Sequence, residues 1–405
     1  MKHLEFPKPQ KQVLELVRET AAEKNVRPYL VGGPVRDLLL GRAAFDIDLT
    51  LEEDSAAFAR ALAKRVNGRV KSFPQFMTYK VVADAMPEID ITTARKERYR
   101  KPGALPLVSP GRLKDDLLRR DFSINAIAFD VLTRALHDPT NGERDLRERL
   151  VRVLHEESFR DDPTRIFRAI RLALRLDFSL EKHTAELMRD AIDNGALGTV
   201  TKERLWRELF LAMDEADAPK ILAELNKAGA LKTLFNAREV ECNRLEEMQR
   251  CIDANAELDR YVMYTSALLY GDASPIDLEG SGFSQKRARN VMQIANEVPR
   301  FADALSDAKS ERQRFRVLRH ASPEMLSVIA SMTTASETVA RFNEYRNFKI
   351  PLRGNELAVP SGPHIAKALE RTREAVFTGE IAPEEAPGFA RELALRYLSE
   401  LRIEN

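Results

Sequence analysis

Residues 30–50, LVGGPVRDLLLGRAAFDIDLT, decide the fold of the first part of the chain. A short apolar run enters the glycine pair Gly32-Gly33, as a strand enters a tight loop. Pro34 then suits the first turn of a helix. After this helix, residues 45–51 alternate apolar and polar side chains, which is the period of a strand. The stretch therefore predicts a strand, a tight turn, a helix and a second strand in close succession.

The flanking sequence continues this mixture of short helices and strands to about residue 145, with residues 102–106 as an irregular loop. The expected elements are helices over 10–23, 34–40 and 54–66, and strands over 28–31, 45–51, 79–83 and 88–92. Beyond residue 150 the apolar spacing is helical almost throughout, and no convincing strand alternation returns. Clear examples are residues 163–176, 184–192 and 203–213. The sequence thus predicts an α+β first domain followed by an all-helical arm.

Composition narrows the class of protein. The chain has 405 residues, 31% charged and 44% hydrophobic, with 64 Lys+Arg against 63 Asp+Glu, which excludes wholesale disorder and predicts several domains. No apolar run is long enough to span a membrane, and residues 1–10 do not resemble a secretory signal. The two cysteines form no CxxC motif, which indicates free thiols. We therefore expect a cytoplasmic protein. Residues 95–120 carry nine basic and three acidic side chains, and residues 286–319 nine and four. These segments are candidate phosphate contacts, with solvated helix faces as the alternative.

Asp46 and Asp48 form the first pattern that carries chemistry. Alternate side chains of a strand share a face about 6–7 Å apart, so both carboxylates can reach one Mg²⁺ site while Ile47 points to the core. Asp90 alternates with apolar residues in a later expected strand and is the candidate third catalytic carboxylate. The upstream glycine pair lets backbone N–H groups approach phosphate oxygens, and Arg36 adds a charge-assisted contact. This combination is typical of two-metal nucleotidyl transfer.

A second pattern is the arginine stripe, formed by Arg165, Arg168, Arg171 and Arg175. Three- and four-residue spacing places these side chains on one face of a helix, while the apolar residues between them can face the core. We expect the arginine stripe to lack acidic partners and to bind phosphate. Salt bridges to neighbouring helices are the alternative.

The chain resembles the class II tRNA nucleotidyltransferases, which include CCA-adding, CC-adding and A-adding enzymes and share their head with bacterial poly(A) polymerases. Three strings carry the resemblance in the family's order: residues 30–50, RRDFSINAIAFD from Arg119 to Asp130, and DDPTRIFRAIRLALRL from Asp161. The similarity is strongest over about residues 28–215. It implies a nucleotidyltransferase head with a small mixed β-sheet and an elongated all-helical neck, body and tail. The expected domains are 1–145 (catalytic head), 146–215 (neck with the nucleotide-selecting template), 216–300 (body) and 301–405 (tRNA-binding tail).

The resemblance also implies roles for individual residues. Gly33 and Arg36 match positions that contact the phosphates and sugar of the incoming nucleotide, and Asp46 and Asp48 match the metal-binding pair. Asp162 and Arg165 match the two residues that read its base. Further nucleotide-binding positions are Gly32, Arg119, Arg120, Asp121, Asn125, Arg168 and Arg171, with Ser123 where the family usually has threonine and Asp161 where it usually has glutamate.

Physical chemistry agrees with this role for Asp162 and Arg165. A carboxylate accepts a hydrogen bond from the exocyclic amino group of cytosine or adenine, and a guanidinium donates to the adjacent ring nitrogen. Uracil and guanine present a carbonyl in place of that amino group and would leave buried groups unpaired. Such mismatches give strong discrimination.

The expected function is addition of CCA, or of its terminal A, to the tRNA 3′ end from CTP and ATP, with Mg²⁺ as cofactor. The expected partner is tRNA, held by its acceptor and T-arm backbone; no membrane and no protein partner is implied. Arg95, Glu97 and Arg98, in the loop expected over 93–106, match a flexible element that family members use for adenosine addition, which argues against CC-only activity. The alternatives are an A-adding-only enzyme, a bacterial poly(A) polymerase and a non-catalytic RNA-binding protein. The polymerase is disfavoured because residues 68–73 lack its expanded basic signature.

Overall fold

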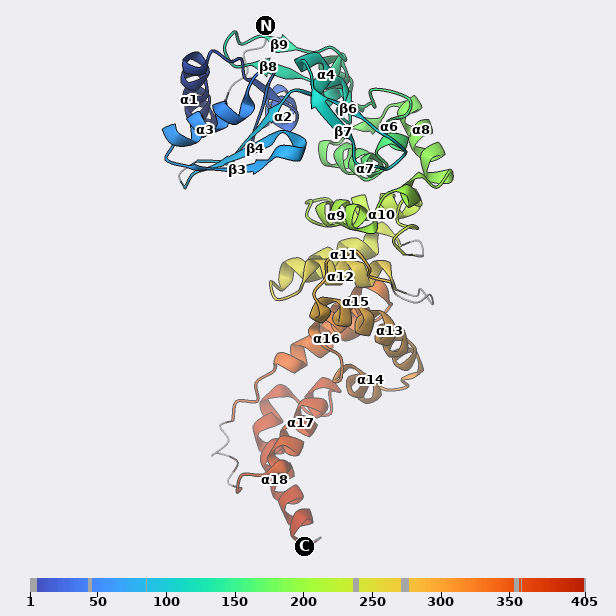
Figure 1. Cartoon of the computed structure of the whole chain (residues 1–405). Helices are drawn as coiled ribbons and strands as arrows, with labels where there is room; N and C mark the ends of the chain where they lie inside the picture. Colours follow the sequence, from blue (N-terminus) through green and yellow to red (C-terminus); the bar gives the residue numbers. More distant parts are fainter. Residues whose placement is uncertain are drawn as a thin grey trace. The chain divides into compact units, whose positions relative to one another are not determined.

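The computed structural model describes residues 6–42, 46–84, 86–235, 240–270, 277–352, 357 and 359–403. The chain forms two compact units, Met1–Thr233 and Leu234–Asn405 (Figure 1). The first unit contains both the expected head and the expected neck. The finer boundaries near residues 145, 215 and 300 stay predictions. Within the described ranges, no helix is long and apolar enough to cross a membrane.

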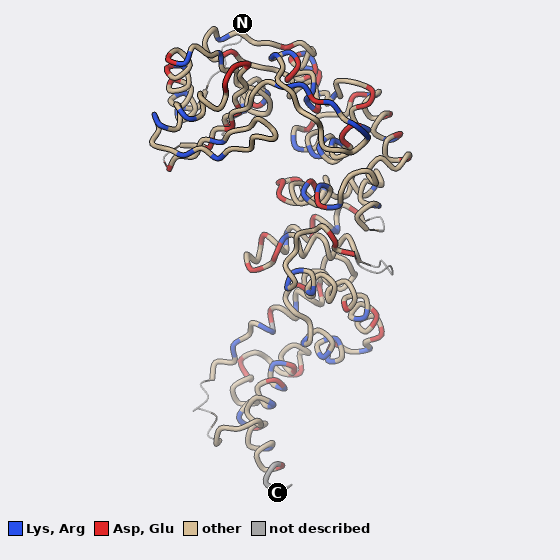
Figure 2. Tube along the Cα trace, in the orientation of Figure 1, with Lys and Arg blue, Asp and Glu red and all other residues tan. Residues whose placement is uncertain are grey.

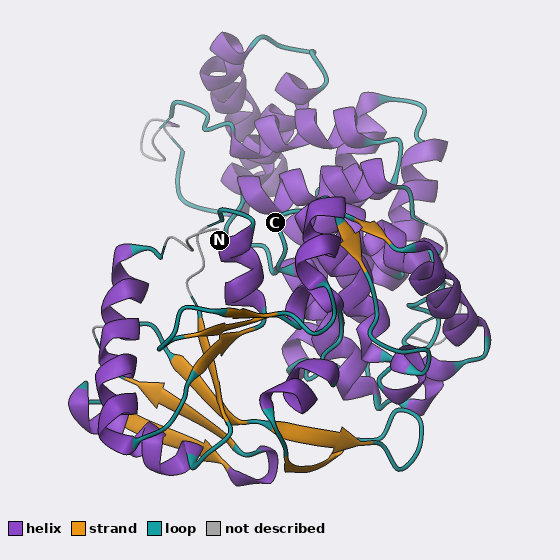
Figure 3. Ribbon diagram, turned by 90° about the horizontal axis from the view of Figure 1, so that it is seen from above, coloured by secondary structure: helices purple, strands orange, loops and turns teal. Residues whose placement is uncertain are grey.

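A mixed sheet of seven strands forms the centre of the head (Figure 3). Its strands are β1 (Tyr29–Val31), β2 (Ile47–Leu51), β3 (Arg69–Phe73), β4 (Thr78–Val82), β5 (Ile89–Thr93), β8 (Ala128–Asp130) and β9 (Leu136–His137). They lie in the order β3-β4-β5-β2-β1-β8-β9. Only β2 and β5 pair in parallel, and their register places Asp48 beside Asp90. The expected mixed sheet is confirmed, and it brings these two carboxylates together.

The sheet forms because its strands bury alternate apolar side chains. In β2, Ile47 is 1% exposed and Leu49 and Leu51 are equally buried, so Asp48 is left on the other face. On the sheet, α3 (Ser55–Arg65) packs against β3 and β4, and α1 (Lys8–Lys24) packs on α3. The Asp54 side chain caps α3 by accepting from the Ala57 N–H at 2.9 Å. The helices and strands expected up to residue 92 are present to within two residues at each described end.

The sequence patterns missed several strands. Residues 95–98 were expected in a loop but form β6 (Arg95–Arg98), which pairs with β7 (Leu107–Pro110) in a β-hairpin. We call residues 99–106 the hairpin tip. Beyond residue 150, β10 (Leu150–Val151) pairs with β11 (Ser179–Leu180), so the expectation of no further strands is wrong. Two-residue strands are too short to show an alternating pattern.

Besides α1, α3 and the short helix η1 (Pro74–Phe76), the first unit contains further helices in both the head and the neck. They are α2 (Gly33–Leu39), α4 (Leu113–Leu118), η2 (Ser123–Asn125), α5 (Gly142–Glu148), α6 (Ser158–Asp161), α7 (Thr164–Leu176), α8 (Lys182–Asp193), η3 (Ala196–Thr199), α9 (Lys202–Met213) and α10 (Ala218–Lys227). α7 packs against α9 and α10 through buried Ile166, Ile170 and Ala173, as its apolar spacing predicted. Trp206 in α9 is 1% exposed and belongs to the core.

The second unit is helical throughout the residues that the structure describes. Its helices are α11 (Cys242–Ala254), α12 (Arg260–Leu268), α13 (Gln285–Asp307), α14 (Glu311–Leu318), α15 (Pro323–Met332), α16 (Ser336–Asn347), α17 (Pro363–Phe377) and α18 (Ala386–Ile403). Phe315, Phe342 and Phe377 form an aromatic cluster between α14, α16 and α17, with ring centroids 5.2 to 6.3 Å apart. Cys242 and Cys251 are free thiols, as expected.

Candidate active site

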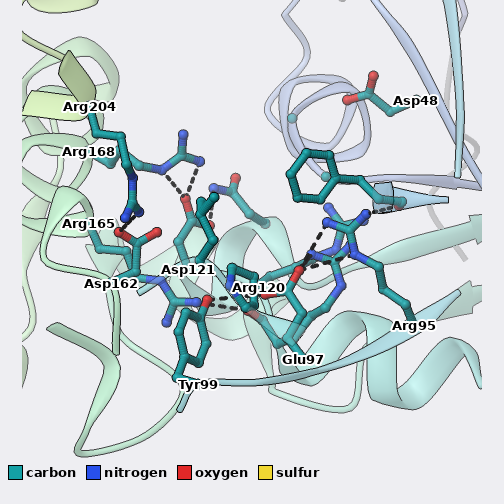
Figure 4. A pocket seen from close by; sticks show the side chains of 17 residues that line it. Asp48, Arg95, Glu97, Tyr99, Arg120, Asp121, Asp162, Arg165, Arg168 and Arg204 are labelled. Carbon is teal, nitrogen blue, oxygen red and sulfur yellow. Dashed lines mark hydrogen bonds and ion pairs between the residues drawn. The ribbon is translucent and has the colours of Figure 1, made fainter. Parts of the chain in front are cut away.

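A pocket of about 450 Å³ lies in the first unit between head and neck residues (Figure 4). Its lining includes most of the residues that the sequence singled out for nucleotide binding. The lining residues are Gly32, Gly33, Asp48, Phe76, Arg95, Glu97, Tyr99, Leu105, Pro106, Arg119, Arg120, Asp121, Asn125, Asp162, Arg165, Arg168 and Arg204. In Figure 4, Asp48 lies on the opposite side from Asp162 and Arg204, so the pocket separates a carboxylate of the sheet from a group on the neck.

The turn between β1 and α2 brings backbone close to a pair of arginines. Gly32 has φ 76° and ψ −137°, a conformation that only glycine adopts readily, and a Cβ built there would lie 2.7 Å from Arg120 Nη1. Arg119 and Arg120 both donate to the fully buried Asp116, at 2.7 and 3.0 Å. Burial tends to raise the pKa of Asp116, but the two guanidinium groups outweigh it and lower that pKa. This cationic wall beside an open backbone suits an anionic ligand such as phosphate.

Asp48 contributes a carboxylate whose ionised form is disfavoured by its surroundings. Burial, together with the neighbouring carboxylates of Asp90 and Asp46, raises the pKa of Asp48 to about 6. Asp90 lies 3.3 Å from the ammonium group of Lys80, and Asp46 is exposed immediately before β2. Neither Asp46 nor Asp90 lines the pocket. Carboxylate oxygens are the donors that a divalent cation such as Mg²⁺ prefers, so Asp48 is a candidate metal ligand at this side of the pocket.

Asp162 lies two residues before α7, and Arg165 lies in the first turn of this helix. Asp162 Oδ1 accepts from Thr164 N at 3.2 Å and from Arg204 Nη2 at 2.8 Å. Arg165 donates from Nη1 to Ser158 Oγ at 2.6 Å and from Nη2 to the Arg119 carbonyl at 3.0 Å. The two side chains are therefore held by the protein itself before any ligand arrives.

A partly buried chain of hydrogen bonds joins the neck to the head. Arg168 forms an ion pair with Asp121, whose other oxygen accepts from Asn125 Nδ2 at 2.9 Å. Asn125 Oδ1 in turn accepts from Arg36 Nη1 at 2.6 Å. Burial would raise the pKa of Asp121, but the Arg168 guanidinium overcomes it and lowers that pKa. Arg36 is 4% exposed, pairs with Asp37, and does not line the pocket.

The arginine stripe has acidic partners, so the expectation that it lacks them is wrong for three of its members. Arg168 pairs with Asp121, Arg171 lies 3.4 Å from Glu208, and Arg175 lies 3.6 Å from Glu215. Arg171 also lies outside the pocket. The carboxylates come from other segments of the chain, so helical spacing within α7 could not reveal them.

Glu97 organises the hairpin side of the pocket. Its side chain is 7% exposed and accepts from Arg95 Nη2 and Arg119 Nη1, both at 3.0 Å, and from the Tyr99 hydroxyl at 3.2 Å. One carboxylate thus holds two arginines and a tyrosine that all line the pocket. Burial raises the pKa of Tyr99, so this phenol stays a neutral donor.

Sequence reasoning missed part of the pocket. Phe76, Tyr99, Leu105, Pro106 and Arg204 line it without having been proposed. Phe76 and the hairpin-tip residues belong to no recognised motif, and Arg204 is one of many charged residues on an amphipathic helix. Only tertiary contacts distinguish Arg204 from its neighbour Arg207, which is exposed.

In the second unit, several arginines of the basic segment 286–319 are paired with acidic side chains, and Figure 2 shows basic and acidic residues distributed along this part of the chain. Arg287 pairs with Asp259, Arg312 and Arg316 pair with Glu374, and Arg319 pairs with Glu370. A groove of about 420 Å³ nearby retains positive charge. It is lined by Phe315, Arg319, Phe342, Arg346, Ala366, Leu369, Glu370 and Arg373. Among the described residues, neither Arg346 nor Arg373 forms an ion pair with an acidic side chain.

Comparison with known proteins gives a consistent result. Residues 28–152 match the poly A polymerase head domain family. The chain is 32% identical over 410 residues to an A-adding tRNA nucleotidyltransferase of Geobacter sulfurreducens, an alignment that covers 93% of this chain and 46% of that protein. It is 38% identical over 249 residues to an A-adding tRNA nucleotidyltransferase of Halalkalibacterium halodurans, which covers 59% of this chain and 58% of that protein. The chain thus spans about half the length of these curated relatives.

A solved structure extends the similarity to nearly the whole chain. The Thermotoga maritima CCA-adding enzyme complexed with tRNA superposes with a TM-score of 0.77 at 27% identity, covering 98% of this chain and 97% of that one. The matched region includes both the head that carries Asp48 and the neck that carries Asp162. Residues 28–152 thus match a poly A polymerase head domain, and nearly the whole chain is similar to tRNA nucleotidyltransferases.

Proposed function

We propose that this protein is a template-independent nucleotidyltransferase that adds CCA, or its terminal A, to the tRNA 3′ end from CTP and ATP and releases pyrophosphate. One observation carries the proposal. The same pocket of about 450 Å³ contains Asp48 of the sheet, the Gly32–Arg120 phosphate wall and the Asp162–Arg165 pair. A metal-binding carboxylate, a phosphate site and a base-reading pair are the parts that such a transfer needs.

Asp162 and Arg165 select the base in this proposal. Both side chains are held by hydrogen bonds to the protein, so they present a fixed acceptor and donor to the ligand. Cytosine and adenine share an amino group that satisfies the acceptor, whereas uracil and guanine place a carbonyl there. An unpaired carboxylate in a confined site costs enough free energy to give strong discrimination.

Asp46 and Asp48 would hold the metal, which we propose to be Mg²⁺. Their carboxylate oxygens are the donors that this ion prefers, and one or two carboxylates are usual because substrate phosphates and waters complete its coordination. When bound, the ion activates the attacking hydroxyl and stabilises the leaving pyrophosphate. Asp90 is proposed as a third catalytic carboxylate because it lies beside Asp48 in the register of β2 and β5.

The tRNA is the proposed partner, with its acceptor and T-arm backbone on the helical arm. Arg346 and Arg373, which line the groove of about 420 Å³ in the second unit, support this proposal because their positive charge can attract phosphate. We also propose a cytoplasmic location, which the two free thiols support. The A-adding-only reaction is the second candidate, favoured by the names of the two curated bacterial relatives.

One experiment tests the reaction and separates these candidates. The purified protein is incubated with Mg²⁺, with tRNA transcripts that end at the discriminator base, at C, at CC or at CCA, and with each labelled triphosphate in turn. A CCA-adding enzyme uses CTP on the first two substrates and ATP on tRNA-CC. An A-adding enzyme uses only tRNA-CC with ATP, and repeated adenosine addition would identify a poly(A) polymerase. Lack of incorporation on every substrate would refute the proposed function.

A further inference from the structure

Arg204 connects two parts of the pocket that lie far apart in the sequence. Its Nη1 donates to the Gly103 carbonyl at 2.7 Å, and its Nη2 donates to Asp162 Oδ1 at 2.8 Å. Gly103 belongs to the hairpin tip, whereas Asp162 precedes α7. Figure 4 shows the Arg204 guanidinium directed at the Asp162 carboxylate inside the pocket. A single side chain of α9 therefore binds both the tip and the base-reading carboxylate.

The hairpin tip is closely packed against the neck at Gly103. The Gly103 N–H donates to the Arg160 carbonyl at 3.2 Å, so both backbone groups of this residue are bound by the neck. Gly103 has φ +70°, and a Cβ built there would lie 2.2 Å from Thr199 Oγ1 and 2.6 Å from the Thr199 carbonyl oxygen. Because the obstacle includes backbone, a side chain at this position would push the tip away from the neck.

The same arginine fixes the orientation of Asp162. Oδ1 accepts from Arg204 and also from the Thr164 hydroxyl at 2.6 Å and the Thr164 N–H at 3.2 Å. Among the described residues no hydrogen bond to Oδ2 is present, so this second oxygen is the one left for a ligand. Arg204 thus occupies one oxygen of the carboxylate and directs the other.

We propose that Arg204 is a positioning residue for base selection, because it holds the hairpin tip on the neck and orients Asp162 with the same guanidinium. The inference rests on the proposed function of the pocket. Leu105 and Pro106 of the tip line the pocket, so displacement of the tip changes the wall facing the ligand as well as the carboxylate. Arginine suits this role because its fork offers two nitrogens to two acceptors at once. Lysine provides a single ammonium that cannot bind both in the same geometry.

Three variants test the coupling. Arg204→Met removes both contacts, Arg204→Lys retains the charge near Asp162, and Gly103→Ala displaces the tip while leaving both side chains in place. Arg207→Met is the matched control, because Arg207 lies on the same helix, is exposed and does not line the pocket. Thermal unfolding of each protein verifies that it is folded.

The first measurement is single-nucleotide incorporation with all four triphosphates on tRNA of defined 3′ end. We expect each of the three variants to lower the preference for CTP and ATP over UTP and GTP by about tenfold, because a displaced tip changes the pocket wall that faces the base. The two Arg204 variants also weaken or remove one of the hydrogen bonds that orient Asp162. The double variant carrying Arg204→Met and Gly103→Ala should lose little more than the more affected single variant, since both break one linkage. Arg207→Met should keep the parental preference.

The second measurement does not depend on catalysis. Trypsin should cleave after the exposed Arg100 faster in Arg204→Met and Gly103→Ala than in the parent or in Arg207→Met, because the tip is released. Cleavage after Lys101 does not interfere, since Pro102 follows it. Calorimetric binding of CTP and UTP with Mg²⁺ should show the same loss of preference as incorporation does.

Several results would overturn the inference. Unchanged cleavage after Arg100 would show that Arg204 and Gly103 do not hold the tip, and faster cleavage with unchanged base preference would show that the tip is not coupled to selection. Full preference in Arg204→Lys would show that charge alone suffices. A parent that binds CTP over UTP but transfers neither would refute the proposed reaction, while the binding preferences of the variants would still decide the role of Arg204.

Discussion

At the scale of single residues, Asp48 illustrates how local charge prepares a site. Its carboxylate is flanked by those of Asp90 and Asp46, and their repulsion, added to burial, raises its pKa to about 6. Such a cluster is unfavourable without a cation and favourable with one. The raised pKa of Asp48 supports the proposal that Asp46 and Asp48 bind a metal ion.

We predict that Asp48→Ala and Asp46→Ala each lower the rate of nucleotide incorporation by orders of magnitude, because each removes a metal ligand. Binding of tRNA should persist, since neither side chain belongs to a phosphate-binding surface. Asp84→Ala is the control, because Asp84 is exposed on the same domain. Rates are measured with tRNA-CC and ATP at saturating Mg²⁺, and near-parental rates in both single variants would disprove the metal assignment.

A second residue-scale prediction concerns Asp162. Asp162→Ala removes the acceptor that is left unpaired when uracil or guanine places a carbonyl opposite it. Discrimination against UTP and GTP should therefore fall by about tenfold or more, while nucleotide transfer continues at a lower rate. The measurement is incorporation of each of the four nucleotides on tRNA substrates of defined 3′ end. Glu157→Ala serves as the control, because its carboxylate is exposed and does not line the pocket. If Asp162→Ala were slower but as selective as the parent, the base would be read by other side chains.

At the scale of elements, the β1–α2 turn and α7 show how backbone and packing carry the site. Gly32 adopts a backbone conformation that other residues reach only at a cost of about 1–3 kcal/mol. Along α7, three of the four arginines that the sequence suggested for phosphate binding are instead paired with carboxylates of other segments. The conformation of Gly32 and the ion pairs of α7 thus each link one element to neighbouring segments of the chain.

The turn leads to a prediction for Gly32→Ala. The added methyl group would meet Arg120 Nη1 at 2.7 Å and strain the backbone, so triphosphate affinity should fall about tenfold or more and the unfolding free energy should fall as well. Gly198→Ala is the matched control, because a Cβ there has no heavy atom within 4 Å. Equilibrium binding of ATP and thermal unfolding measure the two effects. Equal ATP affinities in the two variants would contradict the phosphate role of the turn.

For α7, we predict that Arg171→Met acts on stability. The Arg171 guanidinium is mostly buried and lies near the Glu208 carboxylate. Burial raises the pKa of Glu208, although Arg168 and Arg171 act in the opposite direction. Removing the Arg171 guanidinium therefore leaves a buried carboxylate poorly paired. The unfolding free energy should drop by about 1–3 kcal/mol with base preference unchanged. The double variant with Glu208→Gln should recover part of this loss. A variant of full stability with weakened nucleotide binding would instead support phosphate binding by Arg171.

At the scale of the whole molecule, the proposed binding of tRNA would depend on positive charge in the second unit. Most arginines of the segment 286–319 have acidic partners there, so the number of basic residues overstates its attraction for phosphate. The groove containing Arg346 and Arg373 retains unneutralised charge beside Phe315 and Phe342. This groove is the better candidate for backbone contacts.

We therefore predict that Arg346→Ala and Arg373→Ala each weaken tRNA binding and reduce the slope of log affinity against log salt by about one. The effect should depend little on tRNA sequence, because phosphate contacts position without reading bases. Arg396→Ala is the control, since Arg396 is exposed and pairs with Glu400. Titrations at several salt concentrations measure the slopes, and identical slopes in the groove variants and the control would rule the groove out.

The sequence by itself determined the strand–turn–helix–strand of residues 29–51, the pairing of Asp46 with Asp48 and the apolar face of α7. These features follow from local rules, namely the strand period, the helix period and the conformational freedom of glycine, which act over a few residues. The strings resembling a known family then indicated Asp162 and Arg165, and the structure places both in the pocket with Asp48.

Only the tertiary structure decided which of these residues have partners. Asp121 pairs with Arg168, and Glu208 pairs with Arg171, although the partners belong to separate segments of the chain. Arg204 of α9 donates hydrogen bonds to Gly103 and to Asp162, which lie in two other segments. The hairpin of residues 95–110 was also hidden, because its charged first strand shows no apolar alternation. Periodicity reports which face of an element is buried, whereas the identity of the group on the opposing element depends on how distant segments pack, which a single sequence does not reveal.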